Sequence, residues 1–121
     1  MDEHSSDHNT RQKGQHYETV AADYLISIGY EILDRNWRFH RNEIDLIARE
    51  GETLVFIEVK ARLDPTHGYG MQAVDHKKQQ RIRKVAAAYL LQNHYSFYQT
   101  PCRFDVISID GNEIRLFRNA F

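Results

Sequence analysis

The clearest alternation of hydrophobic and polar positions lies in two neighbouring stretches, residues 43–47 and 54–60. Glu50-Gly51-Glu52 separates them and is a turn signal, so the pattern predicts a β-hairpin from about residue 43 to residue 62. The second arm is almost continuously apolar from residue 54 to residue 59, which indicates a central strand covered on both faces.

The first arm carries acids at alternate positions. Because successive side chains of a strand point to opposite faces, Glu43 and Asp45 share one face, and Ile44 and Leu46 share the other. The second arm changes character partway along one face. Leu54 and Phe56 are followed there, at the same spacing, by two charged residues, Glu58 and Lys60.

The turn decides whether these acids meet, because directly paired residues of two strands lie on the same face. The register expected here pairs Arg49 with Glu52, Asp45 with Phe56 and Glu43 with Glu58. Asp45 then lies diagonal to Glu58, within reach of a shared ligand. Like charges opposite each other are unfavourable, and a bound cation is the simplest reason to tolerate them. The alternative is that these acids form the solvated end of a strand.

Two longer stretches follow the three-to-four spacing of an amphipathic helix, residues 14–28 and 74–94. The first ends at Gly29. Glu18 lies at the edge of its apolar stripe, where an acid also stabilises the first turn of a helix. The apolar stripe of the second helix consists of Val74, Ile82, Val85, Ala86, Tyr89 and Leu90.

Lys78 falls on the apolar stripe of the second predicted helix, four residues from both Val74 and Ile82. A lysine on an inward face must reach water or a charge partner, and the acidic end of the hairpin is the nearest candidate. Lys77, Arg81 and Lys84 form a separate outward row. Such a row is either a solvated helix face or a strip of phosphate contacts beside a cleft.

The remaining strands complete the expected fold. Residues 30–38 read as a first strand, residues 103–109 as a strand parallel to the central one, and residues 113–117 as a last strand after the turn at Gly111. Residues 63–70 read as a loop. The predicted order is helix, three strands, helix, two strands (αβββαββ), an α/β fold with one mixed β-sheet flanked by helices.

Composition narrows the classes of protein that fit. The chain of 121 residues suits one domain at 14–121 after a disordered polar tail at 1–13. The net charge of −1 argues against bulk polyanion binding, so any nucleic-acid contact must come from local patches or from a metal. The single cysteine, Cys102, excludes an intramolecular disulfide, and no segment resembles a membrane span or a signal peptide. We therefore expect a cytoplasmic protein.

Clustered carboxylates beside a lysine suit a hard divalent cation such as Mg²⁺ or Mn²⁺. In phosphodiester hydrolysis the cation polarises the phosphoryl oxygen and activates water, while a lysine stabilises the developing charge. On this interpretation Asp45 and Glu58 are the main metal ligands, the Val59 carbonyl is a further ligand, and Lys60 is the catalytic cation.

The chain also resembles the YraN-like family of small bacterial proteins, placed in the PD-(D/E)xK, or restriction-endonuclease-like, superfamily. The resemblance covers nearly all of residues 14–121. The segments that carry it are 14–22, Asn36, 43–48, 56–62, Gly70, Lys78, 103–106 and 119–121.

The resemblance implies that Asp45, Glu58 and Lys60 match the metal-binding and catalytic motif. It implies that Glu18 matches an acid on the first helix that some junction-resolving relatives use. It also implies that Lys78 matches a family lysine on the second helix, and Glu43 the family's acid beside the aspartate.

The favoured hypothesis is a Mg²⁺- or Mn²⁺-dependent nuclease acting on structured or single-stranded DNA, since so small a domain has little surface for reading a long sequence. One alternative is a non-catalytic nucleic-acid-binding module of the same fold, which would use Lys77, Arg81 and Lys84. Another is a protein-interaction scaffold with solvated acids. A homodimer would help a junction-directed enzyme to cut twice, but the sequence holds no decisive dimer signal.

Overall fold

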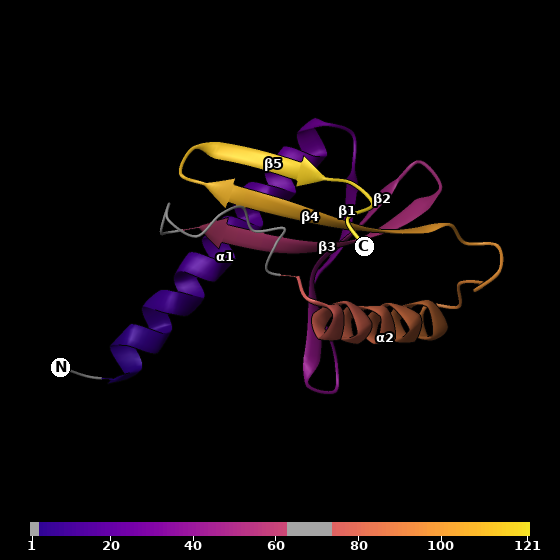
Figure 1. Cartoon of the computed structure of the whole chain (residues 1–121), viewed down its shortest axis with the longest axis horizontal. Helices are drawn as coiled ribbons and strands as arrows, with labels where there is room; N and C mark the ends of the chain where they lie inside the picture. The colour runs from indigo at the N-terminus through magenta and orange to yellow at the C-terminus, as the bar shows by residue number, and fades with distance from the viewer. Residues whose placement is uncertain (1–2, 63–73) are drawn as a thin grey trace.

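The computed structural model describes residues 3–62 and 74–121, which form an open five-stranded sheet with one helix on each face (Figure 1). The elements are α1 (Glu3–Ser27), β1 (Glu31–Phe39), β2 (Asn42–Glu50), β3 (Thr53–Arg62), α2 (His76–Gln92), β4 (Cys102–Asp110) and β5 (Glu113–Phe117). The predicted α/β class and the order αβββαββ are confirmed.

Helix α1 begins at Glu3, well before the predicted start at residue 14. Most of the stretch expected to be a disordered tail is therefore helical, while residues 1 and 2 lie outside the described part. Residues 3–13 contain no proline, so every backbone N–H there can take part in a helix that extends back from Gly14. Neither of the two described helices offers a stretch apolar and long enough to cross a membrane.

The strands are arranged in chain order, β1-β2-β3-β4-β5, so β3 lies in the middle of the sheet. β3 and β4 are parallel, as predicted, because α2 carries the chain from one end of the sheet back to the other. The other neighbouring pairs are antiparallel. The segment expected to be a loop, residues 63–70 with Gly70, lies outside the described residues.

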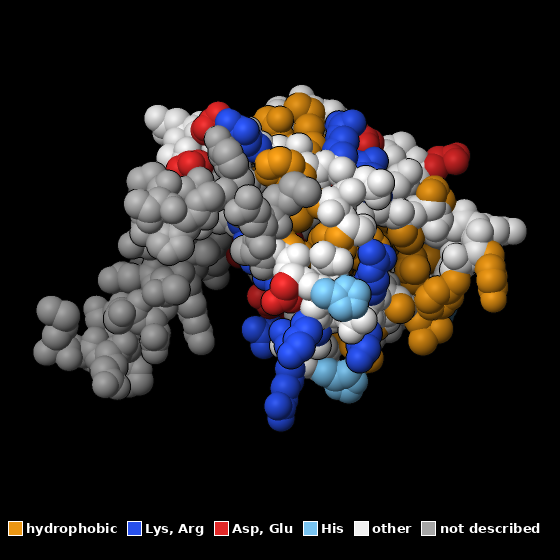
Figure 2. Space-filling view, in the orientation of Figure 1, with side chains coloured by type: hydrophobic (Ala, Val, Ile, Leu, Met, Phe, Trp, Pro, Cys, Tyr) orange, Lys and Arg blue, Asp and Glu red, His pale blue; other side chains and the backbone are white. Residues whose placement is uncertain are grey.

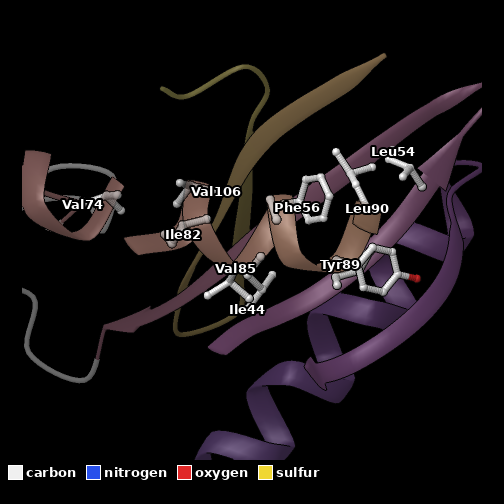
Figure 3. Close-up of a cluster of buried hydrophobic side chains, with 11 residues drawn as sticks. Ile44, Leu54, Phe56, Val74, Ile82, Val85, Tyr89, Leu90 and Val106 are labelled. Atoms are coloured by element: carbon white, nitrogen blue, oxygen red, sulfur yellow. The ribbon is translucent and has the colours of Figure 1, made fainter. Parts of the chain in front are cut away.

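One hydrophobic cluster fills the space between the sheet and α2, and Figure 3 shows its side chains. The predicted apolar stripe of α2 lies in this cluster, so the inward face of the helix is confirmed. Phe56 packs at the centre, edge-on to Tyr89 and stacked on Phe104. The Tyr89 hydroxyl also donates to Asp34 of β1 at 2.7 Å, which attaches α2 to the edge of the sheet.

A second hydrophobic cluster lies between the opposite face of the sheet and α1. Its buried members are Ala21, Ala22, Leu25, Tyr30, Leu46, Ala48, Val55, Ile57, Ile107 and Ile109. The alternation of β3 divides its residues between the two clusters. Phe56 faces α2 whereas Ile57 faces α1, as the pattern predicts. Both faces of the central strand are therefore covered, and β3 can be almost continuously apolar.

The observed hairpin register differs from the predicted one by two residues. Glu50 pairs with Thr53 and Ile47 with Phe56, whereas the prediction paired Asp45 with Phe56. The reason lies in the turn, which consists of Gly51 and Glu52 and begins with Gly51 at φ +61°. Because the shift is by two, the side chains within the paired stretch, Leu46 to Glu50 and Thr53 to Ile57, keep their predicted faces.

Strand β2 does not keep one face along its whole length. Leu46 lies in the cluster under α1, but Ile44 packs in the cluster under α2, although both were predicted to share a face. Pairing with β3 ends at Leu46, while pairing with β1 continues to Asn42. The outer part is thus a two-stranded ribbon, and such ribbons twist more strongly than the interior of a sheet. Asp45 lies at the junction between this two-stranded ribbon and the part of β2 that also pairs with β3.

The C-terminus is fixed to the sheet by a buried polar network around Asp105. The Asp105 carboxylate accepts two hydrogen bonds from Arg103, at 2.9 and 3.0 Å, and one from the Asn119 backbone N–H at 3.0 Å. Arg103 also contacts Glu50 of the hairpin and the hydroxyl of Tyr30. The segments 103–106 and 119–121 therefore hold the C-terminus against the sheet.

Candidate functional site

The site begins where β2 separates from β3. The Asp45 carboxylate accepts a hydrogen bond at 2.8 Å from the backbone N–H of Val59. This contact replaces the ladder, whose last pair is Leu46 with Ile57. Asp45 is thereby held beside Glu58 at the end of the hairpin. Burial raises the pKa of Asp45, although the Val59 hydrogen bond and Lys78 oppose that effect.

Glu58 is the deepest charged group of the site, with its side chain only 5% exposed. One oxygen, Oε2, lies 3.3 Å from Nζ of Lys78. The other, Oε1, is buried and has no hydrogen-bond partner in the described part of the chain. Burial, and then the neighbouring Asp45 carboxylate, raise the pKa of Glu58 to about 7. A buried carboxylate oxygen without a partner is costly and calls for a ligand.

Lys60 follows Glu58 on the same face of β3 and is half-buried. Burial lowers the pKa of Lys60, and its contact with Lys78 lowers that pKa further. The two carboxylates, Glu58 and Asp45, act in the opposite direction. The strand alternation predicted that Lys60 would share the face of Glu58, and the electrostatic influence of Asp45 and Glu58 agrees with that prediction.

Lys78 reaches the site from the first turn of α2. Asp75 caps this helix and accepts the Lys78 backbone N–H at 2.8 Å, which fixes where the turn begins. The first turn contains no acid, and Lys77 and Lys78 both oppose the helix dipole there. The contact of Lys78 with Glu58 offsets that local cost. The predicted acidic partner of Lys78 is therefore confirmed.

Glu18 and Glu43 lie on the α1 side of the same end of the sheet. They line one pocket, together with Asn36. Burial raises the pKa of Glu18, and the nearby Asp45 adds to that effect, while a hydrogen bond with Asn36 opposes it. Glu18 Oε2 is buried without a hydrogen-bond partner among the described residues. Glu43 instead forms an exposed ion pair with Arg38 at 3.1 Å.

A pocket of about 330 Å³ on the α2 side exposes the acids to solvent. Asp45, Glu58 and Glu43 line it, and so does Lys78. Sequence reasoning did not assign Arg41 and Asn42, which also line this pocket. The sequence signal for these two residues is the basic turn directly before Glu43. Nothing in the sequence indicates, however, that this turn folds beside the start of α2. Glu43 lines both pockets and so connects Glu18 with Glu58.

The outward row on α2 is present, and Lys77, Arg81 and Lys84 are all exposed. They belong to different surroundings, however. Arg81 lines the acidic pocket, whereas Lys84 lines an apolar groove further along the helix. The row therefore connects two cavities on one side of the molecule.

A divalent cation would find two carboxylates here, not a complete set of side-chain ligands. Among the described residues, no three His, Cys, Asp or Glu side chains form a group that could hold a metal ion. Magnesium commonly binds through one or two carboxylates and keeps waters and substrate oxygens for its other positions. The unpartnered Glu58 Oε1 beside Asp45 fits that mode of binding.

Comparison with known proteins identifies the relatives of this chain. Residues 17–109 match the model of the uncharacterised protein family UPF0102. A UPF0102 protein of Lachnoclostridium phytofermentans is 47% identical over 93% of this chain and 95% of its own length. One from Chlorobium chlorochromatii is 48% identical over 84% and 77%, and one from Yersinia enterocolitica 41% identical over 92% and 95%. The predicted family resemblance is confirmed, and the chain belongs to the UPF0102 (YraN) family.

Proposed function

We propose that this protein is a Mg²⁺- or Mn²⁺-dependent nuclease of the PD-(D/E)xK type that hydrolyses phosphodiester bonds in DNA. One observation carries the proposal. Glu58 Oε1 is buried next to a second carboxylate and has no hydrogen-bond partner among the described residues, and a half-buried lysine follows on the same strand face. The ion pair with Lys78 involves only Oε2, so it leaves Oε1 available to a ligand.

Asp45, Glu58 and the Val59 carbonyl are the groups that would hold the cation. The hydrogen bond between Asp45 and the Val59 N–H fixes the backbone of β3 at this point. When bound, the cation would polarise the scissile phosphate and lower the pKa of the attacking water. Glu58 must lose its proton to bind it, so the apparent affinity should rise as the pH passes about 7.

The two lysines have separate roles in this proposal. Lys60 faces the reacting phosphate and stabilises the negative charge that develops there. Lys78 stays on Glu58 Oε2 and orients that carboxylate. Glu18 and Glu43 lie on the other side of Asp45 and keep the local field negative, which favours a cation.

The test is nicking of branched and single-stranded DNA by the purified protein with MnCl₂. We expect Asp45→Asn and Lys60→Ala each to reduce the rate by about 100-fold or more, because each removes a group that acts on the reacting phosphate. Glu31→Gln, an exposed carboxylate on β1, is the matched control and should keep full activity.

A thermal melt separates metal binding from turnover. Mn²⁺ should raise the midpoint of the wild type, because a ligand that binds only the folded state stabilises it, and should leave Asp45→Asn unchanged. Equal nuclease activity in the wild type and both site variants would indicate a contaminant and refute the proposal.

A second candidate, a non-catalytic nucleic-acid-binding module, is favoured by the exposed row of Lys77, Arg81 and Lys84. It predicts a salt-dependent DNA shift that survives Asp45→Asn but weakens when these three cations are neutralised. It also predicts no cleavage with any divalent metal.

A further inference from the structure

An apolar groove of about 380 Å³ lies on α2, beyond the acidic pocket and outside the proposed catalytic site. Its walls include Phe39 from the β1–β2 hairpin, Leu91 near the end of α2, and Phe97 from the following loop. Phe97 is 53% exposed and Leu91 67%. Single exposed apolar residues are ordinary, but an apolar groove lined from three segments of the chain has the shape and chemistry of a binding surface.

The described residues that line the groove include one cation and no acid. Lys84 lines the groove, and Arg81, one helical turn earlier, lines the acidic pocket. Figure 2 shows Lys and Arg side chains over the first part of α2 and apolar side chains beyond its other end. From Lys77 to Lys84 the row spans about 10 Å along the helix axis.

We infer that the groove binds an unpaired base of single-stranded DNA whose backbone follows the row of cations to the acidic pocket. This inference rests on the proposed function and names its substrate class. A nucleic-acid strand combines regularly spaced phosphates with bases whose flat faces are apolar. The surface offers a matching row of cations that ends at an apolar groove. Duplex DNA keeps its bases stacked inside the helix, so a duplex satisfies only the cations.

The chemistry of the groove gives RNA no advantage over DNA. Proteins distinguish RNA mainly through hydrogen bonds to the 2′-hydroxyl group. Apart from Lys84 and Gln92, the described residues that line the groove offer only apolar side chains, so a 2′-hydroxyl group would gain little there. The base is held by stacking and apolar contact, which every base can provide, and we therefore expect little sequence preference.

The experiment measures binding of labelled 12-nucleotide strands by fluorescence anisotropy in EDTA, where no cleavage occurs. The strands are a dT single strand, an abasic strand with the same phosphates, a duplex and the matching RNA. The dT strand should bind about 10-fold more tightly than the abasic strand or the duplex, and at least as tightly as RNA. Phe97→Ala and Leu91→Ala should abolish the difference between dT and abasic strands, whereas Phe97→Trp should retain it.

Ile26→Ala is the matched control, because Ile26 is 56% exposed on α1, away from the groove, and its loss should change no affinity. Lys84→Gln should weaken the binding of the dT and abasic strands by the same factor. Equal binding of dT and abasic strands by the wild type would overturn the inference, as would tighter binding of RNA. So would a dimer, detected by sedimentation, that Phe97→Ala dissociates.

The two proposals fail separately. If Mn²⁺-dependent nicking is present but Phe97→Ala changes neither affinity nor rate on single strands, only the groove inference fails. If single strands bind through Phe97 but no metal supports cleavage, the nuclease proposal fails and the groove remains a binding site for single-stranded DNA.

Discussion

Glu58 combines in one side chain the features that set the candidate site apart. Its side chain is almost fully buried, only one of its oxygens has a partner in the part of the chain that the structure describes, and its pKa is raised to about 7. Natural folds rarely leave a buried carboxylate in this state unless something binds it. In the metal-free protein, Glu58 should therefore weaken the fold whenever it is ionised.

The first prediction concerns Glu58→Gln in the absence of metal. A carboxyl with a raised folded-state pKa favours folding only while it is protonated, so the free energy of unfolding should fall as pH rises from about 4.5 to 7. The whole shift corresponds to about 3 kcal/mol. Glutamine is neutral throughout, so Glu58→Gln should lose this part of the pH dependence and be more stable than the wild type at pH 8.

Urea denaturation in EDTA at pH 4 to 8 measures this difference. Glu113→Gln changes an exposed carboxylate on β5 and should keep the wild-type pH profile. If Glu58→Gln is less stable than the wild type at pH 8, the ion pair with Lys78 outweighs the cost of burial, and our interpretation of Glu58 is wrong.

Residue patterns alone could predict which side chains meet at the site, but not which hydrogen bonds they form there. Strand alternation assigns Glu58 and Lys60 to one face, and the helical stripe directs Lys78 inward. The bond from the Val59 N–H to Asp45 could not be predicted, because it depends on where β2 leaves β3. The unpartnered Glu58 oxygen depends likewise on which atom Lys78 reaches.

At the scale of elements, the Gly51 turn sets the hairpin register. Gly51 has φ +61°, a conformation that side chains with a Cβ rarely adopt, although a Cβ there would meet no neighbouring atom. We therefore predict that Gly51→Ala destabilises the protein by about 1 kcal/mol through backbone strain alone. Gly51→Asn should cost less, because asparagine tolerates this conformation.

Gly14→Ala is the matched control for Gly51→Ala. Gly14 lies inside α1, has no positive φ, and has open space where the Cβ of an alanine would lie. Alanine should stabilise the helix there by roughly 0.5–1 kcal/mol. Chemical denaturation measures both variants, and destabilisation of equal size in the two would refute the backbone explanation.

The elements themselves could be predicted better than their exact pairing. The amphipathic spacing located α2 and its buried stripe, and the intervening helix made β3 and β4 parallel. The register failed because the pattern is the same for any shift by two residues, and only the geometry of Gly51 selects one. Ile44 lies on the other face because the two-stranded end of β1 and β2 twists. An alternation of hydrophobic and polar residues in the sequence does not reveal such a twist.

At the scale of the whole molecule, the Asp105 network connects elements that are distant in the sequence. Asp105 is fully buried, and Arg103 joins it to Glu50 of the hairpin and to Tyr30, the residue directly before β1. Asp105→Asn removes one of the two charge partners that a mostly buried arginine has among the described residues, leaving only Glu50, and we predict a loss of about 3 kcal/mol. Glu31→Gln, whose side chain is 62% exposed, should cost less than about 1 kcal/mol.

Urea denaturation at pH 7 compares these two variants, and limited proteolysis reports on the C-terminal segment that Asp105 fixes through Asn119. Cleavage near the C-terminus should become faster in Asp105→Asn only. A loss of stability without faster cleavage would show that the network supports the core and does not fix the terminus.

The parallel pairing of β3 with β4 has a consequence for the order of folding. The hairpin joins residues close in the sequence, starting at Glu50 with Thr53, whereas the β3–β4 pairs, such as Leu54 with Cys102, are 48 residues apart. Contacts between distant residues form more slowly, because a long loop must close first. The nascent hairpin therefore brings Asp45 and Glu58 together before α2 delivers Lys78. During refolding, protons or divalent cations should speed the early phase, because they neutralise the acids until the lysine arrives.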